Sequence, residues 1–229
     1  MGKNHMKRLA APKTWPVRRK GLKFITKPAS GPHGLEVGIP LSVLLKEVLN
    51  YAGTTGDVKK ILNANEIKID GRARKDFRFP VGLFDTVEFT GINEHFRIIL
   101  NRKGKLDAIK IKKEEASLKP CKITGKKIVK GRVQLSLFDG KSILVDSNSY
   151  KVGDTLLLSL PEQKISRHMK LGKKSAIFLT GGSHTGEIGN VEDIVEDKVI
   201  YKDQNGTLVE TSKKYAFVVG DGKQTIALG

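Results

Sequence analysis

Two stretches of the sequence decide the fold of the first half of the chain: Ile67-Lys68-Ile69-Asp70-Gly71 and Phe79-Pro80-Val81-Gly82-Leu83-Phe84-Asp85-Thr86-Val87. In the first stretch two isoleucines flank a polar residue, which is the period-two pattern of a half-buried strand, and Asp-Gly is a turn signal. Phe77, Phe79 and Val81 alternate after this turn, and 84–89 offers another short strand. Together they predict a short sheet.

Two short helices are predicted before this sheet. Pro40 suits a first helical position, and apolar residues repeat at helical spacing from Leu41 to Leu49. Thr54 and Asp57 have the spacing of a capping box, which starts a second helix. Lys59 and Lys60 fall off the apolar face of that helix. Residues 39–91 are therefore expected to form a small domain of two helices and a short sheet, with a basic outer surface.

The rest of the chain reads as β structure. Residues 92–170 alternate apolar and polar positions in several segments and contain a hairpin signal at Asp139-Gly140. Residues 171–229 hold five short strand candidates, which suit a small SH3-like barrel. The predicted class is therefore α+β in several modules: a basic extended N-terminal arm (1–38), a small two-helix domain (39–91), a central β domain (92–170) and a C-terminal barrel (171–229).

Positive charge is concentrated in two segments. The chain has 42 Lys+Arg against 24 Asp+Glu, a formal net charge of +18. Residues 1–35 carry nine basic residues and no acid, and residues 102–132 carry twelve basic and three acidic residues. The stretches 36–101 and 133–229 are each electrically balanced. Such blocks indicate a polyanionic partner, because neutralised phosphates release condensed counterions. In 102–132 a merely solvated face stays an alternative.

The N-terminal arm is broken by proline and glycine and cannot bury a core of its own. We expect it to become ordered on RNA and to contact phosphates through its basic residues, which are Lys3, Lys7, Arg8, Lys13, Arg18, Arg19 and Lys20. Trp15 could stack on an unpaired base or could pack the arm onto the folded body. The sequence leaves both alternatives open.

Signatures of catalysis, cofactor binding and membrane insertion are not found. Gly140-Lys141-Ser142 lacks the upstream glycine of a phosphate loop, and the five histidines have no ligand spacing. No apolar run approaches the length of a membrane span, the basic start lacks the apolar stretch of a secretory signal, and a single cysteine excludes an internal disulfide. We therefore expect an intracellular protein with no enzymatic activity, cofactor, metal or membrane partner.

The modules resemble known RNA-binding families. Ile39 to Phe89 resembles the S-four RNA-binding domain, with Asp70-Gly71 in place of the usual Asn-Gly and Phe84-Asp85 in place of Gly-Asp. The segment Phe178-Leu179-Thr180-Gly181-Gly182-Ser183-His184-Thr185-Gly186-Glu187-Ile188-Gly189-Asn190-Val191 looks like a KOW motif. Joined to His5-Met6-Lys7-Arg8-Leu9-Ala10-Ala11-Pro12-Lys13-Thr14-Trp15 and Gly31-Pro32-His33, this order resembles the archaeal and eukaryotic S-four-e family of small-subunit ribosomal proteins over essentially the full length.

The resemblance implies a structural, non-catalytic component of the cytoplasmic ribosome that binds small-subunit ribosomal RNA and supports its folding and assembly for translation. Its partners would be that RNA and neighbouring ribosomal proteins, with no small-molecule substrate and no homo-oligomer. The family's RNA surface would fall on Lys59, Lys60, Lys68, Arg72, Arg74, Lys75 and Arg78, and the loop glycines of the KOW motif would be Gly181, Gly182, Gly186 and Gly189. Residues 171–229 carry a net charge of −1, so this end could contact a protein or only a local RNA feature.

Two other functions use the same modules. S-four domains occur on RNA-modifying enzymes, but those need a substantial catalytic domain, and only small β modules remain here. KOW barrels occur in transcription elongation factors and RNA chaperones, which would not need the acid-free arm.

Overall fold

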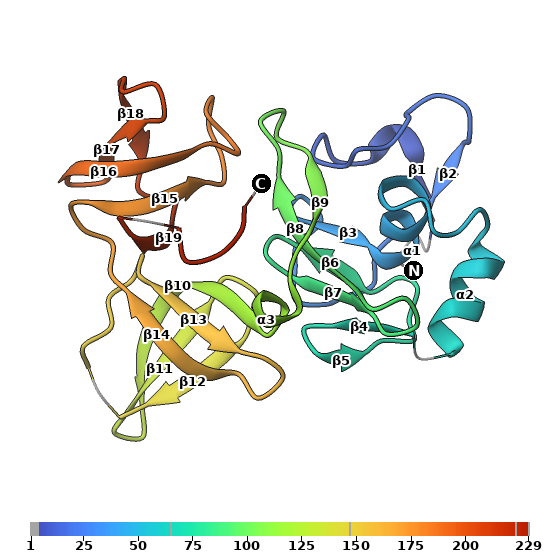
Figure 1. Cartoon of the computed structure of the whole chain (residues 1–229), viewed down its shortest axis with the longest axis horizontal. Coiled ribbons are helices and arrows are strands. Elements are labelled where there is room, and N and C mark those ends of the chain that lie inside the picture. Colours follow the sequence, from blue (N-terminus) through green and yellow to red (C-terminus); the bar gives the residue numbers. More distant parts are fainter. Residues whose placement is uncertain (1–4, 65, 147, 223, 229) are drawn as a thin grey trace. The chain divides into compact units, whose positions relative to one another are not determined.

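The chain is mostly β and separates into two compact units, Met1–Ser117 and Leu118–Gly229 (Figure 1). The computed structural model describes residues 5–64, 66–146, 148–222 and 224–228, which form five sheets and a few short helices. The predicted α+β class overstates the helices. The helix expected after Pro40 is α-helical only over α1 (Leu41–Val43) and continues as a π-helical turn, η2 (Leu44–Val48). Its leucines are nevertheless buried, as their spacing predicted.

The core of the first unit lies on a five-stranded antiparallel sheet of order β5-β4-β7-β8-β9. These strands are β4 (Ile67–Ile69), β5 (Arg72–Ala73), β7 (Thr86–Phe89), β8 (Glu94–Leu100) and β9 (Leu106–Lys110). The remaining elements of the unit are β1 (Met6–Lys7), η1 (Arg8–Ala10), β2 (Phe24–Ile25), β3 (Gly38–Pro40), α2 (Thr55–Asn63), β6 (Pro80–Gly82) and α3 (Lys113–Ala116). Strand β1 pairs with β2 and β3 with β6, both antiparallel.

The capping box that starts α2 is confirmed. The Thr54 hydroxyl accepts a hydrogen bond from the Asp57 amide at 3.2 Å, and the Asp57 carboxylate accepts one from the Thr54 amide at 2.9 Å. Val58 and Leu62 are buried, whereas Lys59 and Lys60 are exposed. The reciprocal cap therefore fixes where the helix begins and, through its register, which lysines face outward.

The turn at Asp70-Gly71 is also confirmed, but the strand expected to follow it is shorter. Asp70 and Gly71 both have positive φ angles, of 50° and 72°, as a type I′ hairpin turn requires. Phe77 and Phe79 lie in a loop, because the Phe79 amide donates to the Asp76 carbonyl and closes a turn there. Regular β structure resumes only at Pro80.

The first sheet of the second unit is curled around its longest strand, β10 (Leu118–Val129). The register of β10 shifts between Ile123 and Gly125, so its first part pairs with β13 and its second part with β11. Such a bulge bends a strand and increases its twist. The strand order is β12-β11-β10-β13-β14, with β11 (Arg132–Leu137), β12 (Ser142–Val145), β13 (Thr155–Ser159) and β14 (Lys164–Met169). The buried core includes Cys121, Ile123, Leu135 and Leu156.

The last sheet has the order β18-β17-β16-β15-β19 and is antiparallel throughout. Its strands are β15 (Ser175–Leu179), β16 (Ile188–Val195), β17 (Lys198–Asp203), β18 (Leu208–Ser212) and β19 (Ala216–Asp221). The four-segment division of the chain stays a prediction. Strand pairing places residues 92–117 in the first unit, because β8 pairs with β7 across the expected boundary at 91/92.

Candidate nucleic-acid interface

The N-terminal arm is docked on the first unit by its tryptophan. Only 1% of Trp15 is exposed, and its Nε1 donates hydrogen bonds to the carbonyl oxygens of Gly38 at 2.9 Å and Leu35 at 3.2 Å. A ring that is fully buried and hydrogen-bonded in this way has no face to offer a base. Trp15 therefore packs the arm onto the folded body, which is one of the two predicted alternatives, and this burial argues against base stacking.

Two arginines of the arm make hydrogen bonds within the first unit. Arg8 is buried, forms an ion pair with Glu47 of η2, and donates to the carbonyl oxygen of Arg18. Arg19 donates to three carbonyl oxygens of the arm, those of Leu9, Ala11 and Pro12, at 2.9–3.1 Å. Phosphate contact by Arg8 and Arg19 stays a prediction, because their guanidinium groups here donate to a carboxylate and to carbonyl oxygens of the arm.

The other predicted arm cations project from this docked segment. Lys7, Lys13, Arg18 and Lys20 are exposed, and Lys3 lies outside the described residues. The Thr14 carbonyl accepts from the Leu106 amide of β9 at 2.7 Å, which fixes the chain next to Lys13. The arm therefore holds its exposed cations at defined positions on the first unit.

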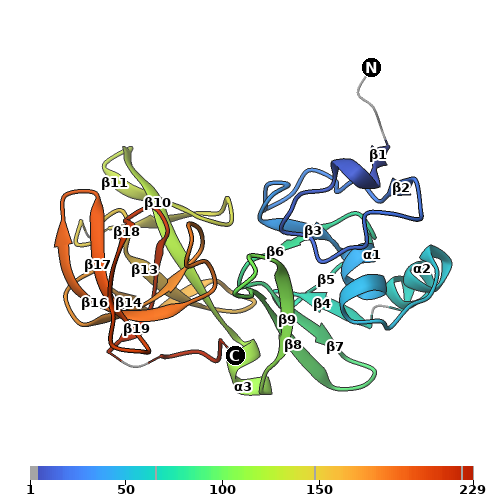
Figure 2. The same cartoon turned by 90° about the horizontal axis from the view of Figure 1, so that it is seen from above.

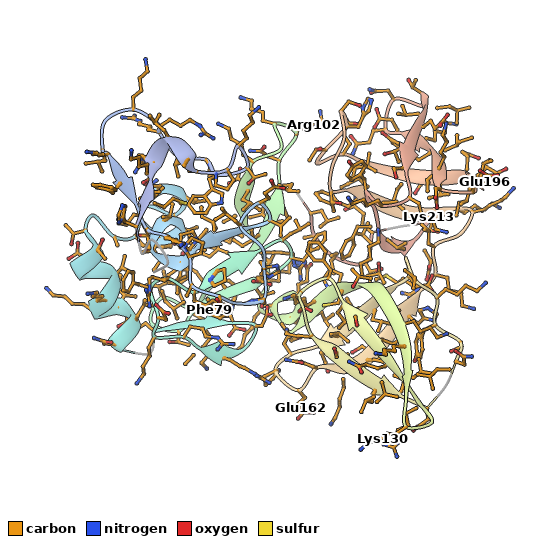
Figure 3. The ribbon with its side chains drawn as sticks, turned by 180° about the vertical axis from the view of Figure 1, so that it is seen from behind. Phe79, Arg102, Lys130, Glu162, Glu196 and Lys213 are labelled. Atoms are coloured by element: carbon orange, nitrogen blue, oxygen red, sulfur yellow. The ribbon has the colours of Figure 1, made fainter. Side chains whose placement is uncertain are left out.

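Basic residues of α2 and of the segment 72–79 lie close to two half-buried phenylalanine rings. The Lys59 ammonium lies 5.2 Å and the Arg78 guanidinium 5.9 Å from the centroid of the same ring, that of Phe77. Arg74 lies 4.4 Å over Phe79, which Figure 3 labels on the first unit. Cations within about 6 Å of an aromatic ring are attracted to its face. We call the predicted set the basic face; its residues are Lys59, Lys60, Lys68, Arg72, Arg74, Lys75 and Arg78.

Exposure and pairing differ within the basic face. Lys60, Arg72 and Lys75 are exposed, whereas Lys68 on β4 and Arg74 are partly buried. Arg78 lies 3.7 Å from Asp76, an exposed pair that is weak in water. The arm adjoins this surface, because the Ala29 amide donates to the Arg78 carbonyl at 2.9 Å. The arm and the basic face therefore meet at Arg78.

Two lysines of the second basic block, Lys119 and Lys126, have structural partners that the sequence did not reveal. Lys119 is buried 3.3 Å from Asp139, which Lys141 approaches at 3.0 Å. Burial alone would raise the pKa of Asp139, but the two lysines hold it below its usual range. Lys126 donates to the carbonyl oxygens of Asn148 and Tyr150 at 3.0 and 2.7 Å. Counting charge along the chain cannot separate such lysines from free ones.

Lys122 joins the two sheets of the second unit. Its ammonium donates to the carbonyl oxygens of Lys213, Lys214 and Ala216 at 3.2, 2.9 and 2.6 Å. Burial, and then the nearby charge of Lys213, lowers the pKa of Lys122 to about 8. Other cations of the block lie at hairpin tips: Figure 3 shows Arg102 at the tip of β8–β9 and Lys130 at the tip of β10–β11.

The four glycines of the KOW-like loop are each required by the backbone or by a neighbouring ring. A Cβ on Gly181 would lie 2.5 Å from the ring of Tyr215, and one on Gly189 would lie 2.3 Å from the ring of Tyr201. Gly182 and Gly186 have φ angles of 90° and 81°. These reasons are internal to the second unit, so the glycines alone do not indicate a ligand there.

Metal binding and membrane insertion find no structural support in the described part of the chain. Among its residues, no three His, Cys, Asp or Glu side chains are grouped so that they could hold a metal ion. No helix in the same ranges combines the length and the hydrophobicity needed to cross a bilayer.

Comparison with known proteins gives matches over almost the whole chain. The model of the ribosomal family S4e matches residues 92–165, and that of the RS4NT (NUC023) domain matches residues 1–36. The chain is 40% identical to small ribosomal subunit protein eS4 of Methanocella arvoryzae, covering 95% of this chain and 94% of that one. It is 42% identical to the protein of the same name from Archaeoglobus fulgidus, covering 98% of both.

A solved structure agrees. The crystal structure of 30S ribosomal protein S4e from Thermoplasma acidophilum has a TM-score of 0.71 and 30% identity, and the match covers 84% of this chain and 98% of that one. These similarities lead to one conclusion: the chain belongs to the archaeal-type family of small ribosomal subunit protein eS4, a non-enzymatic ribosomal protein family.

Proposed function

We propose that this structural component of the small ribosomal subunit binds ribosomal RNA through the docked arm and the basic face, and supports folding and assembly of that RNA for translation. The observation that carries the proposal is the convergence of Lys59 and Arg78 on the ring of Phe77. Residues 19 positions apart in the sequence thereby form one charged surface, to which the arm is hydrogen-bonded at Arg78.

Electrostatics support this surface as a phosphate-binding one. Residues 5–35 contain no acid, and the exposed arm cations Lys7, Lys13, Arg18 and Lys20 belong to the same unit as the basic face. Lys and Arg fix a protein on nucleic acid through phosphate contacts that carry no sequence information. Folded RNA is recognised largely through its shape and backbone, so we expect recognition of a junction rather than of a base sequence.

The modules divide this work in the proposal. Residues 39–91 act as an S-four-like RNA-binding domain, with a capped helix beside a hairpin, and residues 1–38 as its basic extension. Of the predicted central β domain (92–170), residues 118–170 form the curled sheet of the second unit, and residues 171–229 act as a KOW-type SH3-like barrel. The last module carries a net charge of −1, and we assign it to a neighbouring ribosomal protein or a local RNA feature. The protein acts as a single copy within the cytoplasmic ribosome.

Neutralising part of the basic face tests the proposal. In the full chain, Lys59, Lys60, Lys75 and Arg78 are replaced by Ala, and binding to archaeal small-subunit ribosomal RNA is measured at several salt concentrations. Each lost phosphate contact should reduce the slope of log affinity against log salt by roughly 0.7 to 0.9, and affinity should fall at low salt.

The matched control removes the same charge elsewhere. Lys173, Lys174, Lys198 and Lys214 are exposed on the second unit, and two of them already pair with Asp193 and Glu210. Their replacement by Ala should leave the salt slope nearly unchanged. If both variants lost RNA affinity and salt slope equally, only net charge would matter, and the assignment to the basic face would be wrong.

A further inference from the structure

Three large apolar side chains in and beside the β1–β2 ribbon of the arm are exposed. Leu9, Leu22 and Phe24 have 72%, 71% and 50% of their surfaces exposed. The paired residues Met6 and Ile25 lie on the inner side, where Ile25 is buried. Among the three exposed side chains, Phe24 is the one that strand pairing places on the outer side of the ribbon, opposite to the side of the buried Ile25.

The outer side of the ribbon combines an aromatic ring with cations. Lys7 lies directly opposite Phe24 in the antiparallel pair, so both side chains leave the same face. The Lys23 ammonium lies 5.6 Å from the centroid of the Phe24 ring, and the His5 ring meets it edge-on at 5.4 Å with an interplanar angle of 84°. The Phe24 ring thus lies beside the Lys23 ammonium and the His5 imidazole, with half of the residue still exposed.

The charge around this ring selects the partner. No acid occurs in residues 5–35, whereas eight Lys and Arg residues do. A protein surface would need its own acidic patch to lie here, whereas RNA brings phosphates for the lysines and a flat base for the ring. Single-stranded nucleic acids are bound by this combination of basic groups and stacking rings.

The ribbon is anchored before any RNA binds. Arg8 follows β1 directly and is buried against Glu47 of η2, and its amide continues the ladder to the Lys23 carbonyl at 2.9 Å. Figures 1 and 2, two views that differ by a 90° turn, both show β1 and β2 above α1 within the first unit. A preorganised platform binds with a smaller entropic cost than a free arm.

We propose that Phe24 is the base-stacking residue of the arm, and that it binds one unpaired nucleotide of ribosomal RNA whose flanking phosphates contact Lys7 and Lys23. This inference rests on the proposed function, because it places a stacked base at the RNA surface already assigned to the arm. It also gives the stacking role, considered for Trp15, to an exposed ring.

Substitutions at position 24 in the full chain test the inference. Phe24→Ala should weaken binding to archaeal small-subunit ribosomal RNA by roughly 5- to 150-fold with the salt slope unchanged, since one stacked base is lost and no phosphate contact is. Phe24→Trp should retain the affinity, whereas Phe24→Leu, which is apolar but has no aromatic face, should behave as Phe24→Ala. Thermal unfolding checks that each variant is folded.

Two controls separate the outcomes. Leu208→Ala removes another exposed apolar side chain, on the second unit, and should bind as the wild type does. Lys7→Ala should lower the salt slope by about 1.

A wild-type chain without salt-dependent binding would overturn the proposed function itself. Normal RNA affinity of Phe24→Ala would overturn only the stacking role, and if that variant also entered subunits poorly, the occupant would be a neighbouring protein. Equal affinity of Phe24→Leu and wild type would likewise exclude stacking.

Discussion

His33 of the arm and Asp85 of the β6–β7 turn form a buried pair, with His33 Nε2 lying 2.9 Å from both carboxylate oxygens. One of these oxygens also accepts the Gly82 amide at 2.9 Å. The imidazole fills the space above Gly82, where a Cβ would lie 2.3 Å from the ring. The arm therefore contributes to the interior of the first unit and is not merely laid on its surface.

Removing His33 should loosen the arm. In His33→Ala the buried carboxylate loses hydrogen bonds, and we expect the free energy of unfolding to fall by roughly 1 to 3 kcal/mol. Trypsin should then cleave the RNA-free protein faster at Lys13, Arg18 and Lys20, as followed by mass spectrometry. His184→Ala removes a half-exposed imidazole from the second unit and should change neither measurement. Unchanged cleavage of the arm in His33→Ala would show that this pair does not hold it.

Trp15 reports directly on whether the arm is ordered without RNA. It is the single tryptophan of the chain and is buried with both Nε1 acceptors in place. We expect blue-shifted emission that acrylamide quenches poorly in the RNA-free protein, and little change when ribosomal RNA is added. Trp15→Phe should preserve the fold better than Trp15→Ala, which should cost about 3 to 5 kcal/mol. Emission typical of solvent-exposed tryptophan would mean that the free arm is undocked.

The sequence predicted those features of the first unit that depend only on residues close together in the chain. The Thr54–Asp57 cap and the Asp70-Gly71 turn are each specified by adjacent residues, and both occur as predicted. Phe84 shows where pattern and structure diverge. It has a φ angle of 65°, in the left-handed region that favours glycine, and the resembling pattern has glycine there. The phenyl ring of Phe84 is buried, and its packing offsets that strain. A sequence pattern does not contain this packing.

The candidate site was harder to predict because it depends on contacts between distant residues. The nine cations of 1–35 look alike in the sequence. In the structure, however, Arg8 and Arg19 bind acceptors of the protein itself, while Lys7 and Lys13 are exposed. Phe24 was missed because the arm was expected to have no fold that could hold an aromatic ring. The available signal was a single aromatic residue, Phe24, flanked by the basic residues Lys20, Lys23 and Lys27.

Glycine substitutions should separate close packing from loop freedom in the second unit. Gly189→Ala would push a Cβ into the Tyr201 ring and the Lys202 carbonyl oxygen, at 2.3 and 2.7 Å. We expect a loss of about 1 to 3 kcal/mol in unfolding free energy, measured by urea titration, because a packed strand pair must separate. Gly172→Ala is the matched control, since a Cβ there meets no atom within 4 Å. Equal stability of the two variants would contradict the packing role of Gly189.

Asp139 should make the stability of the second unit sensitive to acid. Its pKa lies below its ordinary value because Lys119 and Lys141 outweigh the effect of burial. A carboxyl group of this kind stabilises the fold fully above its unfolded pKa, and the stabilisation is lost as the pH falls through the lower, folded value. Asp139→Asn leaves the buried Lys119 without its carboxylate, so at pH 7 it should cost roughly 3 to 5 kcal/mol. Urea unfolding from pH 7 down to acid should show this difference shrinking below about pH 4.

Asp146→Asn, which removes an exposed partner of Arg132, should cost less than about 1 kcal/mol at any pH. A constant difference between Asp139→Asn and wild type across the acid range would show that the carboxylate charge is not what stabilises this pair.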